Sequence, residues 1–251
     1  MRFKGKATLV TGAASGIGRA TASLLAAEGA EVALADLNRE GAERAAEKLA
    51  ATHGVKTHAF SYDAADAEQC IQLVENAAAA LGRLDVLVNN AGILLWARTH
   101  ECEPEQWNKV LAINLHAVFY VTRAALPLLL AAKGNIVNIS SAAGLNGTPY
   151  AAAYSASKAG VLGFTRALAV EYADCGVRVN AICPGAVETP LIQKTTIPEW
   201  ADLKKIYHMA TKTGKASKPE EIAAAVAYLA SADACNVTGI ALPVDGGQTA
   251  G

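Results

Sequence analysis

The chain has 251 residues, of which 52% are hydrophobic and 18% are charged, and its formal net charge at pH 7 is −1. This length and composition suit one α/β domain with a sizeable core. A near-neutral chain offers no basic field to hold nucleic acid or an anionic membrane, so we expect neither as a partner.

The opening residues run straight into an apolar stretch and show no signal-peptide pattern. The most lipid-like stretch, residues 124–132, contains Pro127 and is too short to span a bilayer. Five cysteines without a CxxC pair indicate reduced thiols. They are Cys70, Cys102, Cys175, Cys183 and Cys235. We therefore expect a cytoplasmic protein.

Short apolar, β-rich runs alternate with longer helical patterns along the chain. Strands are predicted over residues 7–10, 31–35, 56–61, 86–89, 135–140, 178–183 and 239–243, and helices over 16–28, 39–51, 67–81, 105–132, 155–172 and 219–231. This alternation predicts βαβ units, and near-continuous apolar strands predict a sheet buried on both faces. We expect α/β architecture: a single Rossmann-type domain over residues 1–251, with a doubly wound parallel sheet of about seven strands and helices on both faces.

One segment, residues 186–217, has little pattern of its own. It carries two prolines, one tryptophan and five lysines between a strand end and a helix. A long irregular segment inside a compact domain is usually functional, so we expect a lid over the substrate site. A plain surface excursion is the alternative.

A glycine-rich turn follows the first predicted strand, and a helix follows the turn. Gly12 suits the tight turn, Gly16 lets backbone approach a pyrophosphate, and Gly18 permits close packing of helix on strand. The exposed N–H groups and the positive end of the helix dipole attract phosphate. In this strand–turn–helix context the turn predicts dinucleotide binding, with an ordinary structural loop as the alternative.

Asp36 closes the second predicted strand, eighteen residues after Gly18. A carboxylate there can accept hydrogen bonds from the adenosine ribose, and it repels a 2′-phosphate. Arg39 lies three residues further on, and its positive charge could instead accommodate the 2′-phosphate of NADP. The charge pattern favours NAD over NADP, and a helix N-cap is the other interpretation of Asp36.

Tyr154 and Lys158 stand four residues apart, on one face of a predicted helix. A free tyrosine titrates near ~10, so it is a poor base at neutral pH. A nearby ammonium, or the cationic ring of an oxidised nicotinamide, lowers the pKa of the phenol. The pair therefore predicts a proton donor and acceptor.

These residues resemble the short-chain dehydrogenase/reductase family over essentially the whole chain. The motifs that carry the resemblance occur in the family's order: the turn 11–18, Asp63, Asn89-Asn90-Ala91-Gly92, Asn114, Ser141, Tyr154 with Lys158, Pro184-Gly185, Val187 to Pro190 and Val244 to Gly247. Each motif is short, and their joint order is what makes the resemblance specific.

The resemblance implies a role for each matching residue. Tyr154 is implied as the general acid/base, Ser141 as the donor to the substrate oxygen, and Lys158 as the residue that holds the nicotinamide ribose. Asn114 is implied to keep a water that links Lys158 to solvent. The implied cofactor contacts are Gly12, Ser15, Gly16, Ile17, Gly18, Asp36, Asp63, Ala64, Asn90, Tyr154, Lys158, Pro184, Gly185, Val187 and Thr189.

The implied reaction is hydride transfer between a secondary alcohol and the nicotinamide of NAD, without a metal. None of the five histidines (53, 58, 100, 116 and 208) stands in a ligand-type arrangement. Trp96, Leu145 and Tyr150 are candidate substrate contacts beside Ser141. Because most candidate lining residues are apolar, we expect a small, moderately hydrophobic alcohol or ketone.

Two long apolar helices, 105–132 and 155–172, are typical of the family's paired interfaces, so the resemblance implies a homotetramer. Three alternatives stay open from the sequence. One is an NADPH-dependent 3-oxoacyl-thioester reductase, which shares every motif except Asp36. The others are a dinucleotide-sensing regulator without turnover and a subunit that serves assembly.

Overall fold

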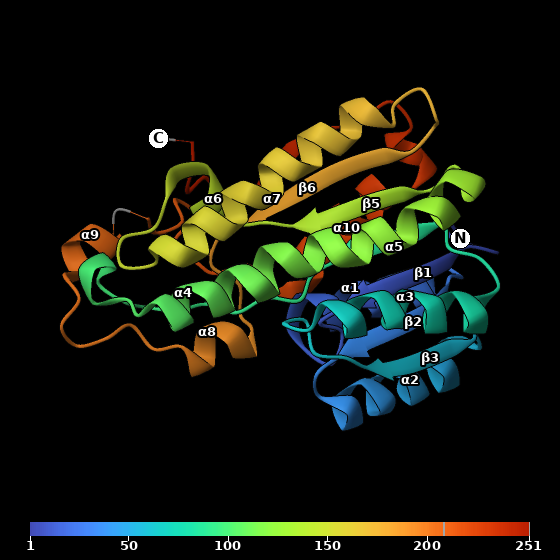
Figure 1. Cartoon of the computed structure of the whole chain (residues 1–251), viewed down its shortest axis with the longest axis horizontal. Coiled ribbons are helices and arrows are strands. Elements are labelled where there is room, and N and C mark those ends of the chain that lie inside the picture. The colour runs from blue at the N-terminus through green and yellow to red at the C-terminus, as the bar shows by residue number, and fades with distance from the viewer. Residues whose placement is uncertain (208, 251) are drawn as a thin grey trace.

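Seven parallel strands form one sheet in the order β3-β2-β1-β4-β5-β6-β7 (Figure 1). The computed structural model describes residues 1–207 and 209–250, so His208 lies outside the described residues. The strands are β1 Ala7–Thr11, β2 Glu31–Asp36, β3 Thr57–Ser61, β4 Val86–Asn89, β5 Asn135–Ile139, β6 Arg178–Pro184 and β7 Ala241–Val244. The predicted doubly wound α/β fold is confirmed, and the chain order reverses on either side of β1 and β4.

Helices connect successive strands. They are α1 Gly16–Ala27, α2 Arg39–His53, α3 Ala67–Leu81, α4 Pro104–Leu111, α5 Ala117–Ala132, α6 Ala142–Asn146, α7 Ala152–Glu171, α8 Pro190–Lys194, α9 Leu203–Tyr207 and α10 Pro219–Ala230. The short helices α6, α8 and α9 were not expected, because five residues give no readable periodicity. The predicted helix 105–132 is interrupted by a π-helical segment, Ala112–His116.

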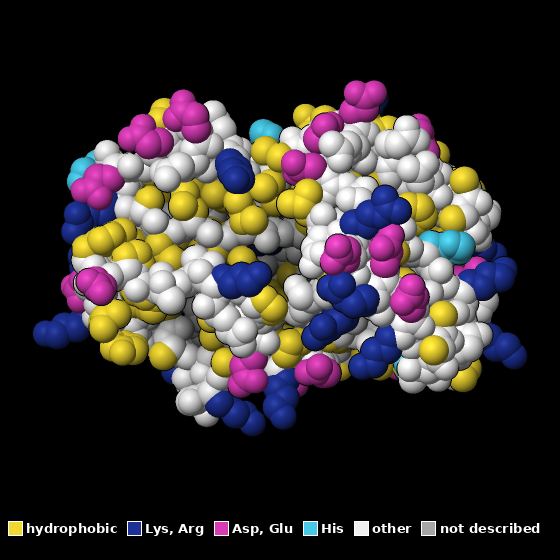
Figure 2. All heavy atoms as spheres, turned by 90° about the horizontal axis from the view of Figure 1, so that it is seen from below, with side chains coloured by type: hydrophobic (Ala, Val, Ile, Leu, Met, Phe, Trp, Pro, Cys, Tyr) yellow, Lys and Arg dark blue, Asp and Glu magenta, His cyan; other side chains and the backbone are white. Residues whose placement is uncertain are grey.

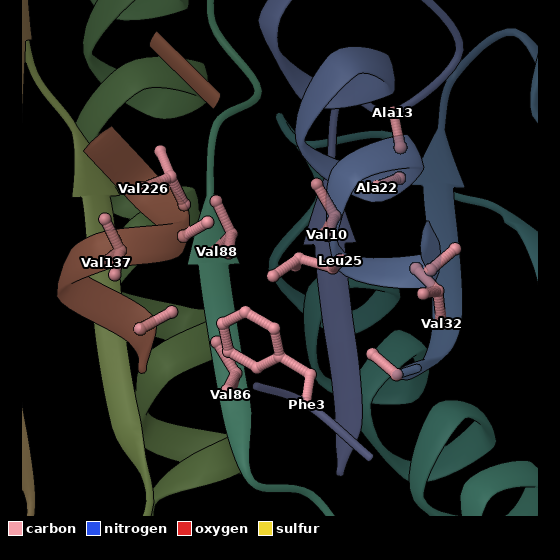
Figure 3. Packing of buried hydrophobic residues seen from close by; sticks show 14 of the residues in the cluster. Phe3, Val10, Ala13, Ala22, Leu25, Val32, Val86, Val88, Val137 and Val226 are labelled. Carbon is pink, nitrogen blue, oxygen red and sulfur yellow. The ribbon is translucent and has the colours of Figure 1, made fainter. Parts of the chain in front are cut away.

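Two hydrophobic cores lie on opposite faces of the sheet. On one face, Val10, Val88 and Val137 of neighbouring strands point toward Leu25 of α1 and Val226 of α10 (Figure 3). On the other face, the strands pack against the apolar sides of α3, α5 and α7. Because both faces are covered, β1, β4 and β5 are buried at every position, and most of their residues are apolar.

The helix running from Pro104 to Ala132 is long and apolar enough to cross a membrane by length and composition alone. In the fold, its C-terminal half lies along the sheet, and Val121, Ala125 and Leu129 are buried in the second core. It is therefore a core helix that covers one face of the sheet.

A chain of buried polar side chains crosses the sheet below the site. Asn89 Nδ2 donates to Thr122 Oγ1 at 3.0 Å and to Asn138 Oδ1 at 2.9 Å. Asn138 Nδ2 in turn donates to Thr165 Oγ1 at 2.9 Å. These bonds tie α5 and α7 to β4 and β5, and a buried network that is satisfied in this way fixes their relative positions.

Replacing Asn138 by Ala leaves the Asn89 amide short of an acceptor in the core. We expect Asn138→Ala to lower the free energy of unfolding by about 2–3 kcal/mol, measured by urea denaturation. Asn76→Ala on the exposed side of α3 is the matched control and should change stability by less than about 0.5 kcal/mol. Equal effects of the two substitutions would contradict the role given to the network.

Candidate active site

A single cleft of about 430 Å³ opens at the carboxyl ends of the strands. It is lined by Gly12, Ser15, Gly16, Ile17, Asp36, Asp63, Ala64, Asn90, Ser141, Tyr154, Lys158, Pro184, Gly185, Val187 and Thr189. Figure 2 shows one face of the molecule hollowed near its middle, with hydrophobic side chains gathered beside the hollow. The fold thus brings together the predicted cofactor residues other than Gly18, which is buried behind the turn, and three of the four predicted catalytic residues.

The glycine turn is built by backbone that other residues do not readily adopt. Gly12 and Gly16 have φ values of +64° and +53°. A Cβ on Gly18 would lie 2.2 Å from the Gly12 carbonyl oxygen, so only glycine lets α1 begin this close to β1. The turn is followed by a twelve-residue helix with no acidic residue in its first turn. Its free N–H groups suit a phosphate group.

Thr11 and Asn90 hold the glycine turn against the end of β4. The backbone N–H groups of Asn90 and Ala91 donate to Thr11 Oγ1 at 2.9 and 3.1 Å. Asn90 Nδ2 donates back to the carbonyl oxygens of Thr11 and Gly12 at 2.9 and 3.1 Å. Asn90 therefore shapes the turn as well as lining the cleft.

Asp36 ends β2 at the rim of the cleft. One of its carboxylate oxygens accepts the N–H of Ala14 at 2.9 Å, and the other accepts the N–H of Asn38 at the same distance. The N-cap of α2 is Asn38 and not Asp36, because Asn38 accepts the N–H of Gly41. The Arg39 side chain is 74% exposed and forms an ion pair with Glu43, with 2.7 Å between Arg39 Nε and Glu43 Oε1.

Asp63 and Ala64 line the same end of the cleft, after β3. Asp63 Oδ1 accepts the N–H of Ala65 at 2.8 Å, which holds the loop in a tight turn. Tyr62, just before it, is buried and also lines the cleft, although no motif or spacing singles it out.

Ser141, Tyr154 and Lys158 meet at the end of β5. Ser141 caps α6 by accepting the N–H of Ala143 at 3.1 Å, and its hydroxyl is hydrogen-bonded to the Tyr154 phenol. Lys158 lies one turn after Tyr154 on α7, with Nζ 5.8 Å from the centre of the tyrosine ring. The neighbouring Ser140 is occupied elsewhere, because its hydroxyl donates to the Lys158 carbonyl at 2.8 Å.

Asn114 lies behind these residues, in the π-helical segment, and is fully buried. Its Oδ1 accepts the N–H of Ile93 at 2.8 Å, while its Nδ2 donates to the Ile93 carbonyl at 2.9 Å and to Ser157 Oγ at 3.1 Å. π-Helical turns often occur at functional sites. Here the turn carries a side chain that binds the loop after β4 to α7.

Burial controls the protonation of the two titratable groups. The pKa of the Tyr154 phenol is raised above its ordinary value because burial penalises the phenolate, and the hydrogen bond from Ser141 opposes this. The sequence predicts the opposite, a lowered pKa for Tyr154, because Lys158 lies one helical turn away. That prediction does not hold for this structure. The Lys158 ammonium instead donates to the Ile139 carbonyl at 2.8 Å. Burial lowers the pKa of Lys158 to about 8.

The three predicted substrate residues lie away from this cleft. Leu145 packs on Leu162, Ala181 and Cys183. Tyr150 lines a separate apolar cavity of about 260 Å³, and Trp96 Nε1 donates to the Thr195 carbonyl at 3.3 Å. The cleft is lined instead by Ile93, Ile113, Ile139, Leu191, Ile192 and Lys194. Leu191 was expected among the lining residues, and Ile93 could have been singled out because it directly follows the Asn-Asn-Ala-Gly motif.

The chain matches a family model described as enoyl-(acyl carrier protein) reductase over residues 12–249. It is 42% identical over 250 residues to cyclohexanol dehydrogenase of Acinetobacter sp. (strain SE19), covering 99% of this chain and 96% of the relative. It is 40% identical over 248 residues to a 3-oxoacyl-(acyl-carrier-protein) reductase of Thermotoga maritima, covering 98% and 99%.

A crystal structure of a short-chain dehydrogenase from Mycobacterium paratuberculosis bound to NAD has the same fold. The TM-score is 0.91 at 29% identity, with each chain covered completely. The chain belongs to the short-chain dehydrogenase/reductase family. It is an oxidoreductase of that family, and its substrate and its choice of cofactor are considered below.

The lowered pKa of Lys158 makes a prediction about stability and pH. The unfolded chain takes up a proton at about 10.5, whereas the folded chain takes it up only below about 8, so stability rises as pH increases between these values. Below pH 8 the buried ammonium costs up to about 3 kcal/mol. We expect Lys158→Met to remove this rise from the pH profile of the unfolding free energy.

Other buried groups, such as Cys183, titrate in both proteins, so the difference between the wild-type and Lys158→Met profiles is the quantity to compare. Lys109→Met, on the exposed side of α4, is the matched control and should leave the profile unchanged. Parallel wild-type and Lys158→Met profiles would show that the ammonium is not desolvated.

Proposed function

We propose that the chain transfers hydride between a secondary alcohol and NAD, with Tyr154 as its proton-transfer residue. The observation that carries this proposal is the joining of two sets of residues in one cleft. The glycine turn and Asp36 lie at one end, and Ser141, Tyr154 and Lys158 at the other.

The residues present fit a dinucleotide. The cradle at Gly12, Gly16 and Gly18 excludes any Cβ and suits a pyrophosphate on the start of α1. Asp36 suits the adenosine ribose, with Asp63 and Ala64 near the adenine and Asn90 near the inner ribose. Pro184, Gly185, Val187 and Thr189 line the far end, where the carboxamide of nicotinamide would bind. When bound, the nicotinamide supplies the hydride acceptor or donor.

The chain's own groups orient the alcohol and move its proton. Ser141 Oγ and Tyr154 Oη are hydrogen-bonded to each other, so both can reach one substrate oxygen. Tyr154 takes the proton of the alcohol in oxidation and returns it in reduction. Lys158 provides the positive charge that favours the phenolate once its ammonium turns from Ile139 toward the cleft. Asn114 fixes the Ile93 backbone on one wall.

NAD is favoured over NADP by the charges around Asp36. Its carboxylate lines the rim of the cleft, where it would accept hydrogen bonds from a ribose and repel a 2′-phosphate. The nearby Arg39 is paired with Glu43 and does not offset it. The NAD-bound structural relative supports the same choice.

The lining of the cleft favours a compact, weakly polar substrate. Ile93, Leu191 and Ile192 form its walls, and Lys194 is the cation at its edge. Relatives named cyclohexanol dehydrogenase and, at 41% identity over 250 residues, cyclopentanol dehydrogenase of Comamonas testosteroni support a small cyclic alcohol. The relative named 3-oxoacyl reductase keeps an NADPH-dependent thioester reductase as the second candidate.

The lid over residues 186–217, the cytoplasmic location and a homotetramer belong to the same proposal. Five unpaired cysteines suit a reducing compartment. Phe119 on α5 and Val170 on α7 are 45% and 82% exposed, which suits apolar helix faces that pair with another copy. Sedimentation equilibrium would test the assembly, and a stable monomer would exclude it.

The central test is a screen of secondary alcohols with NAD from about pH 7 to about pH 9, a range that spans the pKa of Lys158, following reduced cofactor by absorbance. We expect Tyr154→Phe to lower kcat by about 10²–10⁴-fold while NADH still binds. Tyr120→Phe, on the α5 helix, is the control and should keep full activity. Substantial turnover by Tyr154→Phe would exclude the proposed mechanism.

The cofactor choice makes a separate prediction. Asp36→Asn removes the charge and keeps one acceptor, so we expect the ratio of kcat/KM with NAD to that with NADP to fall by about tenfold or more. Glu47→Gln, an exposed carboxylate on the neighbouring helix α2, should change it far less. A wild-type preference for NADPH would overturn the assignment and favour the thioester reductase.

A further inference from the structure

The segment after Thr189 crosses the cleft from its cofactor end to its substrate end. The segment starts beside the glycine turn, because a Cβ on Gly16 would lie 3.1 Å from Thr189 Cγ2. Helix α8 then carries Leu191 and Ile192 along the wall of the cleft. Directly after α8, the Thr195 carbonyl accepts the Trp96 Nε1–H from the loop that follows β4.

Beyond Thr195 the segment is held by Trp200, which contacts two other side chains. The guanidinium carbon of Arg98 is 4.7 Å from the centre of the Trp200 ring, and the Tyr150 ring stands edge-on to it at 5.3 Å and 90°. The N–H of Asp202 also donates to Tyr150 Oη at 3.4 Å. We call Arg98, Tyr150 and Trp200 the clasp. Cation–π and edge-to-face contacts of this kind are directional, so they fix the position of Trp200.

The clasp also joins two loops that both reach the catalytic residues. Arg98 belongs to the loop after β4, which begins with Ile93 and the Asn114 contact. Tyr150 belongs to the loop between Ser141 and Tyr154, and its carbonyl accepts the Ala97 N–H at 2.8 Å. The two loops are thus bonded to each other, and Trp200 is bound to both.

Tyr150 holds its place in the clasp through an unusual backbone. Its φ is +63°, a left-handed conformation that a bulky residue rarely adopts. Such a conformation persists only where surrounding contacts hold it, and it often marks a functional position. Here it directs the tyrosine ring out of the loop and onto Trp200.

We propose that the clasp determines which substrates the enzyme accepts, with Trp200 as the specificity-determining residue. Ile93 lines the cleft from the loop after β4, and Leu191 and Ile192 line it from α8. Because the clasp ties the segment that carries α8 to the loop that carries Ile93, it fixes the position of these lining residues relative to one another. A clasped cleft takes compact alcohols, and an opened one takes bulkier alcohols. This inference rests on the proposed function.

The test compares Trp200→Ala, which removes both stacking contacts, with Trp200→Phe, which keeps an aromatic ring there. The measured quantity is the ratio of kcat/KM for 1-phenylethanol to that for cyclohexanol, with NAD in excess. We expect Trp200→Ala to raise this ratio by about tenfold and Trp200→Phe to change it much less. The Kd for NADH should change little, because the proposed cofactor contacts Val187 and Thr189 precede α8, and the clasp holds the segment only beyond α8.

Tyr207→Ala is the matched control, because Tyr207 is an exposed aromatic residue of the same segment and has no part in the clasp. It should leave the ratio unchanged. An unchanged ratio in Trp200→Ala, or an equal change in Tyr207→Ala, would overturn the proposal. If Trp200→Ala does not fold, Arg98→Gln removes one side of the stack, and the same ratio should rise, to a smaller extent.

A second measurement does not depend on turnover. Lys204 and Lys205 follow Trp200 closely, so trypsin cleavage there reports release of the segment. We expect faster cleavage in Trp200→Ala than in wild type or Tyr207→Ala. Faster cleavage of Trp200→Ala, with no turnover of any alcohol by the wild type, would exclude the proposed function but support the clasp as a contact that holds the segment. Equal cleavage rates in all three proteins would show that the clasp does not hold the segment.

Discussion

Thr11 and Asn90 form the contact on which the rest of the site depends. With their neighbours Gly12 and Ala91 they form four hydrogen bonds, which join the carboxyl ends of β1 and β4, the two strands at which the chain order of the sheet reverses. A crevice opens at such a reversal, because the connections on either side leave in opposite directions. By fixing the two strand ends, these bonds fix the floor of the cleft and the glycine turn above it.

Polar groups extend this rigidity through the sheet and into the helices. The Asn89–Asn138 chain ties β4 and β5 to α5 and α7 below the site, and Asn114 ties the loop after β4 to α7 beside it. Ser141 and Tyr154 come from different elements, α6 and α7, yet their hydroxyls meet. Preorganisation of this kind is what allows a hydroxyl pair to receive one substrate oxygen without rearrangement.

Local patterns were enough to predict the seven strands, the order of the motifs and the shared cleft. The i,i+4 spacing of Tyr154 and Lys158 fixes a common helix face, and Asp36 follows a strand whose end must lie at the cleft. Contacts between distant segments were not readable in the same way. The Lys158 ammonium turns to Ile139, and the pKa of Tyr154 rises, because both effects depend on burial in the assembled fold.

At the substrate end of the cleft, the sequence predicted even less of the side-chain arrangement. Trp96, Leu145 and Tyr150 stand close to the catalytic motifs in sequence, but loop geometry directs each of them elsewhere. A left-handed tyrosine and a five-residue helix leave no periodic signal. The segment after Thr189 could be expected to cover the cleft, and what could not be expected was the set of side chains that fastens it.

The π-helical segment Ala112–His116 has a consequence for the whole length of its helix. A π turn holds one residue more than an α turn, so everything after it is rotated by about 100° relative to an uninterrupted helix. Helix α4 can therefore present its apolar side to α7 while α5 presents its own to α3 and the sheet. Removing a single residue here would restore a regular helix, withdraw Asn114 from Ile93 and turn one half of the helix off its partner. The extra residue sets the rotation of α5 relative to α4, so both its presence and its position are required for the two helices to reach their separate partners.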